Sequence, residues 1–155
     1  MGLDSWLWVR QRISAHQPQQ EESFEAVCEL MGTTPLAVQE FSHTYMGFVV
    51  LEVAYWRNAH FIHAWLEDCL RYELPNNVWS PPLRRSELEH LYTVCQRISQ
   101  DPTLAEQLLP PTLHYNVAQH YPQLQATLPM LEFILGQSTW ANEAVYEFVY
   151  QCAWS

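Results

Sequence analysis

The sequence contains no lysine. All seven of its basic residues are arginines, against 17 aspartates and glutamates, so the formal net charge is −10 with histidine neutral. A chain this acidic is poorly suited to bind the phosphate backbone of nucleic acid directly. It is better suited to contact a basic protein surface, including a surface that itself holds nucleic acid.

Several catalytic signatures are also missing. Only four glycines are present, too few for a glycine-rich loop that cradles phosphate, and no G-x-S-x-G nucleophile motif occurs. The cysteines Cys28, Cys69, Cys95 and Cys152 form no C-x-x-C pair, which argues against a zinc knuckle or a dithiol redox motif. We expect them to be small core residues. These absences favour a non-enzymatic protein without a cofactor.

Membrane and secretion signals are absent as well. No apolar run reaches the length of about 18 residues that a membrane span requires. The start, MGLDSWLWVRQR, lacks a basic segment and a small-residue cleavage site, so we predict a cytoplasmic protein. With 155 residues, 48% of them hydrophobic, the chain can build one core, and we predict a single domain over 1–155.

Hydrophobic periodicity predicts an α+β fold. Alternating or dense β-branched and aromatic residues predict strands near 1–9, 46–56 and 144–154, in a small and largely antiparallel sheet. Helical spacing predicts several helices packed against that sheet, at 21–31, 57–72, 86–100 and from about 124 to Gly136. A short helix or an irregular turn is predicted at 35–42, and a short helical turn near 103–109. Ser86 and Glu89 have the spacing of a capping box. Pro129 should kink the last helix or mark its start.

Three segments resemble a family of small uncharacterised proteins from phages and mobile elements. The opening MGLDSWLWVR resembles MGLDMYLYxR, residues 52–68 resemble E-V-x-Y-W-R-K-x-N-x-I-H-x-W-F, and the ending FVYQCAWS resembles F-Y-Y-Q-x-S-W. The chain departs from the pattern at Ser5 and Trp6 (Met-Tyr in the family), Asn58 (Lys) and His60 (Asn). The resemblance implies a phage origin and makes the chain a candidate anti-CRISPR protein against a type I system.

The acidic residues supply candidate partner-binding surfaces. Glu21, Glu22, Glu25 and Glu29 form one ridge on the predicted helix 21–31, with no basic residue interleaved to relieve their repulsion. A run of charges usually faces water, and glutamates early in a helix stabilise its dipole. The secondary acidic candidates are Glu67, Asp68, Glu73, Glu87 and Glu89.

Two polar clusters lie around the central motif. His60, His63 and Glu67 share one helix face and form a possible, weak metal-ligand set. The alternative places His63 at the edge of the core, hydrogen-bonded to a carboxylate or carbonyl, with His60 in solvent. Asp4, Glu52 and Arg57 should form a buried ion-pair network, beside a pocket lined by Tyr55, Trp56 and Trp65.

We therefore expect a non-enzymatic inhibitor that docks an acidic, aromatic-containing surface on a host Cas protein and blocks DNA binding or cleavage. No direct contact with nucleic acid or membrane is expected. Two alternatives remain open. One is a small phage enzyme or metalloprotein centred on His60, His63, Glu67 and Glu52. The other is a structural homo-oligomer, for example a homodimer, with tryptophans at its self-interface.

Overall fold

The computed structural model describes residues 2–14, 25–26, 28–29, 46–111 and 117–155. The chain divides into two compact units, residues 1–9 together with 51–155, and residues 10–50. In the second unit, the Arg10 guanidinium lies 4.6 Å from the ring centroid of Phe48. The predicted segment 35–42 and most of 21–31 lie outside the described residues. The single domain over 1–155 stays a prediction.

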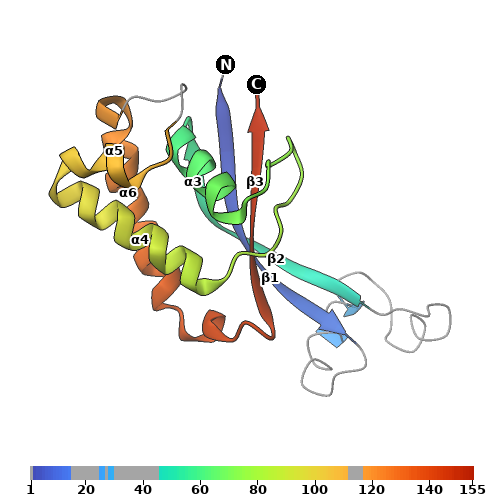
Figure 1. The fold of residues 1–155 in the computed structure, drawn as a ribbon. Helices are drawn as coiled ribbons and strands as arrows, with labels where there is room; N and C mark the ends of the chain where they lie inside the picture. Colours follow the sequence, from blue (N-terminus) through green and yellow to red (C-terminus); the bar gives the residue numbers. More distant parts are fainter. Residues whose placement is uncertain (1, 15–24, 27, 30–45, 112–116) are drawn as a thin grey trace. The chain divides into compact units, whose positions relative to one another are not determined.

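The sheet has three strands, β1 (Leu3–Ser14), β2 (Met46–Arg57) and β3 (Tyr146–Trp154), in the order β2-β1-β3. Gly2 and Ser155 exchange both backbone hydrogen bonds at 3.0 Å, which makes β1 and β3 antiparallel and places the two ends of the chain side by side (Figure 1). The three predicted strands and the α+β fold class are therefore confirmed.

Burial alternates along β1 and gives the sheet two unlike faces. Leu3, Ser5 and Leu7 are buried, whereas the intervening Trp6 and Trp8 are only half-buried. Successive strand residues point to opposite sides, so one face is sealed by the core and the other is not. We call them the covered face and the open face.

Helices seal the covered face within the first unit (Figure 1). They are α3 (His60–Leu70), α4 (Arg85–Gln100), α5 (Ala105–Leu108) and α6 (Val117–Gly136), with short 3-10 turns η2 (Pro102–Leu104) and η3 (Ser138–Ala141). Apolar side chains from α3, α4 and α6, among them Ile62, Leu91 and Leu131, form one core with Leu3 and Leu7 of β1. None of the described helices is long and apolar enough to cross a membrane.

Helix α3 starts three residues later than the start at residue 57 that the periodicity predicts. Strand β2 continues through Arg57, and Asn58 then adopts a left-handed conformation with φ of 57°. Asparagine tolerates this region better than most residues, and here its side-chain Oδ1 accepts a hydrogen bond of 3.0 Å from the backbone N–H of Leu3. This turn replaces the predicted first helical turn, so α3 begins at His60.

The predicted capping box was wrong, and the last helix starts earlier than predicted. The cap of α4 is Arg84, whose backbone N–H donates to the Glu87 carboxylate at 2.6 Å, so Ser86 and Glu89 do not form the predicted capping box. Helix α6 begins at Val117 and ends at Gly136, the predicted end, so Pro129 lies inside the helix and does not mark its start. Pro129 is exposed, so water can bind the carbonyl that its missing N–H leaves free.

The outer edge of β3 is covered by an extended segment. Asn77, Ser80 and Leu83 each donate a backbone hydrogen bond of 2.7 Å to a carbonyl of β3, those of Cys152, Tyr150 and Phe148 in turn. An unpaired strand edge would expose polar backbone groups to pairing with other chains. The segment 77–83 removes that liability and fixes the position of the C-terminal strand beside α3.

Candidate functional site

His63 of α3 joins the helix layer to the sheet. Its side chain is only 9% exposed, its Nδ1 lies 3.3 Å from the hydroxyl of Tyr150 on β3, and its Nε2 lies 3.2 Å from Glu67 Oε1. The i, i+4 spacing puts His63 and Glu67 on the same side of α3. The same Glu67 oxygen accepts a hydrogen bond of 2.9 Å from the backbone N–H of Leu74.

Burial determines the protonation states of His63 and Tyr150. Desolvation lowers the pKa of His63, and the neighbouring Glu67 carboxylate opposes that shift. The imidazole is therefore neutral at pH 7. A neutral ring has one donor and one acceptor, so we assign Nε2–H as the donor to Glu67 and Nδ1 as the acceptor from Tyr150. Burial also raises the pKa of Tyr150, which keeps its hydroxyl protonated.

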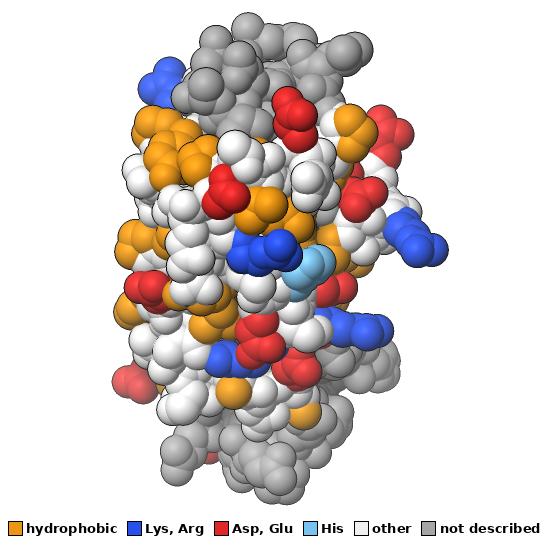
Figure 2. Space-filling view, turned by 60° about the vertical axis from the view of Figure 1, so that its left-hand side comes forward, with side chains coloured by type: hydrophobic (Ala, Val, Ile, Leu, Met, Phe, Trp, Pro, Cys, Tyr) orange, Lys and Arg blue, Asp and Glu red, His pale blue; other side chains and the backbone are white. Residues whose placement is uncertain are grey.

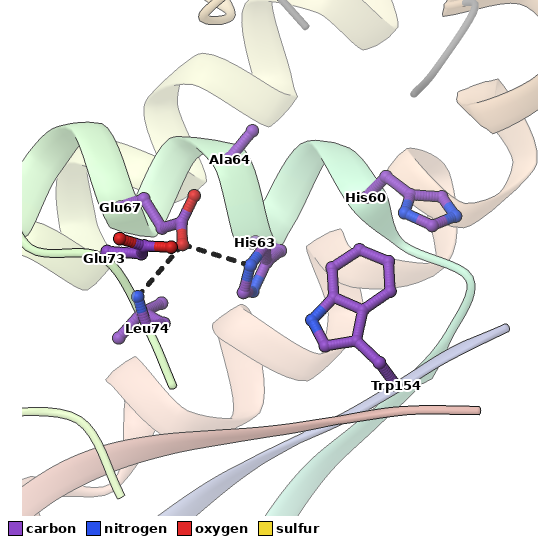
Figure 3. Close-up of a pocket in the computed structure, with 7 residues that line it drawn as sticks. All are labelled: His60, His63, Ala64, Glu67, Glu73, Leu74 and Trp154. Carbon is purple, nitrogen blue, oxygen red and sulfur yellow. Dashed lines mark hydrogen bonds and ion pairs between the residues drawn. The ribbon is translucent and has the colours of Figure 1, made fainter. Parts of the chain in front are cut away.

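A pocket of about 250 Å³ opens beside this chain of groups (Figure 3). Its wall combines two carboxylates, two imidazoles and one indole, supplied by α3, the loop that follows it and the end of β3. The lining residues are His60, His63, Ala64, Glu67, Glu73, Leu74 and Trp154. The ring centroid of Trp154 lies 5.3 Å from that of His63 and 5.5 Å from that of His60.

The structure shows how His60, His63 and Glu67, the predicted metal-ligand set, are arranged. His63 and Glu67 are bonded to each other, the arrangement expected for a histidine at the edge of the core, although His60 is half-buried rather than in solvent. Within the part of the chain that the structure describes, no three His, Cys, Asp or Glu side chains are placed to hold a metal ion.

All four cysteines are free; Cys69 is half-buried and the other three are buried, as predicted for core residues.

The predicted buried ion-pair network is wrong. Glu52 and Arg57 are exposed, and Asp4 is half-buried and accepts a 2.7 Å hydrogen bond from the hydroxyl of Tyr55. Glu52 lies in the middle of β2, where the prediction assumed burial because its neighbours are apolar. The helices α3 to α6 leave Glu52 exposed, so its carboxylate faces water and needs no buried partner.

The aromatic pocket predicted beside that network does not form either. Trp56 is buried on the covered face, where its indole N–H donates to the Thr127 hydroxyl at 2.9 Å. Trp65 is buried in the core, 5.5 Å from the ring of His90. Tyr55 follows the opposite side of β2 and is 42% exposed. The alternation of strand residues therefore separates Tyr55 from the two tryptophans.

The acidic candidates of the first unit have different surroundings, and the predicted ridge of Glu21, Glu22, Glu25 and Glu29 stays a prediction. Glu21 and Glu22 lie outside the described residues, and Glu25 and Glu29 are exposed. Glu87 caps α4, whereas Glu89 lies 3.3 Å from Arg85. On the side turned forward in Figure 2, acidic, arginine and hydrophobic side chains are interspersed. Asp68 is exposed on α3, and Glu67 and Glu73 line one pocket together.

The open face of the sheet carries an apolar surface that the motif analysis did not single out. The rings of Trp6 and Tyr55 lie 5.8 Å apart, on neighbouring strands. Pairing of Asn58 with Leu3 puts Trp8 opposite Val53 in the same register, and Leu51 farther along β2 is 55% exposed. We call Trp6, Trp8, Leu51, Val53 and Tyr55 the aromatic face. The even-numbered tryptophans of β1 were the sequence signal for it.

In comparisons with known proteins, no protein-family model, curated protein or solved structure matches this chain.

Proposed function

We propose that this chain is a non-enzymatic inhibitor that acts in the bacterial cytoplasm by binding a Cas protein of a type I CRISPR system. The observation that carries the proposal is the aromatic face. Leu51 and Tyr55 are 55% and 42% exposed there. Exposed apolar patches on a sheet commonly mark sites of protein association.

Aromatic side chains are suited to anchor such a contact. Tryptophan and tyrosine supply large buried area at low entropic cost and dominate the energetics of many interfaces. The choice of partner rests on the net charge of −10 and on the resemblance to phage proteins. An acidic inhibitor is attracted to the arginine- and lysine-lined channel with which a surveillance complex holds nucleic acid.

A direct binding measurement tests this proposal. Purified type I surveillance complex is immobilised, and the affinity of the wild-type chain is compared with that of a Trp6→Ala/Tyr55→Ala variant. Removal of one interface hot spot typically weakens binding by about 30-fold, so the loss of both rings should weaken it by at least that much. Phe133→Ala is the matched control, because Phe133 is 56% exposed on α6 rather than on the sheet. It should bind like the wild type.

Removal of two large rings could unfold the chain, so a gentler variant accompanies the first. Leu51→Gln changes one exposed side chain without opening the core, and it should weaken binding about tenfold while the melting temperature stays within a few degrees. Wild-type binding by both folded variants would refute the proposal. A stable dimer in light scattering that Leu51→Gln dissociates would instead assign the aromatic face to a second copy.

A further inference from the structure

The pocket beside His63 has two chemically distinct ends. Figure 3 shows the carboxylates of Glu67 and Glu73 at one end and the rings of Trp154 and His60 at the other. Neither lysine nor arginine contributes to its lining. The site therefore joins a negatively charged end to an aromatic end within one concavity of about 250 Å³.

Charge decides which class of ligand fits. His63 is bonded on both ring nitrogens and remains neutral, so it does not offset the two carboxylates. A cleft with charge of one sign concentrates the field and attracts the opposite ion. Anionic ligands such as phosphates and carboxylates are therefore disfavoured, and an organic cation is favoured.

The size of the pocket and its aromatic end restrict the class of ligand further. Pockets for drug-sized ligands usually start near about 300 Å³, so this pocket suits a single side chain or a compact amine. The half-buried Trp154 offers a ring for cation–π contact and for packing of an aliphatic stem. A planar guanidinium has five N–H donors, enough to serve two carboxylates at once, whereas an ammonium has three.

We propose that this pocket binds a guanidinium group on an aliphatic stem, the chemistry of an arginine side chain. Glu67 and Glu73 bind the charged head, and Trp154 packs against the stem. The bonds of Glu67 to His63 and Leu74 fix one of its oxygens in position. The site is independent of the aromatic face and of the Cas partner proposed above.

The test uses the purified chain alone and follows the indole N–H signal of Trp154 by NMR. That signal is identified by its loss in Trp154→Phe. The probe is N-acetyl-arginine amide, and its neutral match in shape is N-acetyl-citrulline amide. We expect a saturable shift with the arginine probe and at least about tenfold weaker binding of the citrulline probe. N-acetyl-lysine amide should also bind more weakly.

Variants locate the site. Glu73→Gln and Glu67→Gln should each weaken arginine binding by at least about threefold, because each removes one carboxylate charge. Glu106→Gln, a change of an exposed glutamate on α5, should leave binding unchanged. Equal affinity for arginine and citrulline, equal affinity for lysine, or equal weakening by Glu106→Gln would overturn the assignment. Tighter binding of free arginine than of the amide would identify a free amino acid as the source, and the reverse order a protein side chain.

Discussion

Replacement of Tyr150 by phenylalanine tests the hydrogen bond between Tyr150 and His63, which joins the helix layer to the sheet. The Tyr150 side chain is fully buried, and its hydroxyl lies 3.3 Å from Nδ1 of His63. The substitution keeps the ring and removes one oxygen. A buried hydrogen bond contributes about 1 kcal/mol net, and an imidazole nitrogen left unpaired adds a desolvation penalty. We expect Tyr150→Phe to lower the free energy of unfolding by about 1–2 kcal/mol at neutral pH.

A double-mutant cycle in urea isolates the contribution of this contact. In a His63→Leu background the hydroxyl has lost the imidazole as a partner, so the same Tyr150→Phe change should cost about 1 kcal/mol less than in the wild type. Tyr92→Phe is the matched control: its hydroxyl also donates to a side chain, that of Glu132 at 2.8 Å, but at an exposed position. It should cost less than about 0.5 kcal/mol. An equal cost of Tyr150→Phe in both backgrounds would refute the coupling.

Further predictions concern stability and thiol reactivity. The folded pKa of His63 lies below its ordinary 6.5. Below pH 6.5 the unfolded chain therefore takes up the proton first, and stability falls by up to about 1.4 kcal/mol per pH unit until the folded pKa is reached. Urea unfolding at pH 8 and pH 5 should show a smaller loss for His63→Gln; an identical loss contradicts the assignment. Trp56→Phe should cost about 2 kcal/mol in thermal unfolding, because the hydrogen bond to Thr127 and part of the buried ring are lost; a neutral effect argues against that bond. Pro129→Ala should raise stability, by up to about 3 kcal/mol, because it restores a helical N–H; destabilisation would show that the proline ring is needed. Burial raises the pKa of Cys95 to about 12, so iodoacetamide should alkylate the half-buried Cys69 first, and the reverse order would contradict the packing.

The sheet was predictable because strand alternation is a local property of the sequence. Leu3 and Leu7 alternate with Trp6 and Trp8, and this pattern predicts a strand with both faces partly covered. The structure confirms the strand but buries only the side of Leu3, Ser5 and Leu7. The start of α3 was not predictable from periodicity. It depends on Asn58, whose side chain bonds to the backbone of β1, a contact between residues 55 positions apart.

The candidate site was predictable only in part, for the same reason. Spacing places His63 and Glu67 on one helix face, and the structure joins them at 3.2 Å. Tyr150 lies 87 residues from His63, and only the register of β3 brings it there. Glu52 was predicted to be buried but is exposed. Apolar neighbours along a strand do not reveal how far the helices extend over it. Burial of a strand residue is decided by what packs above it.

The most direct test of the proposed function is cleavage of target DNA by a reconstituted type I surveillance complex with its nuclease, with the chain added at increasing concentration. The account predicts that the wild type and Phe133→Ala stop cleavage at equal concentrations, whereas the Trp6→Ala/Tyr55→Ala variant does not. Undiminished cleavage with excess wild-type chain, or equal inhibition by the double variant, would contradict it.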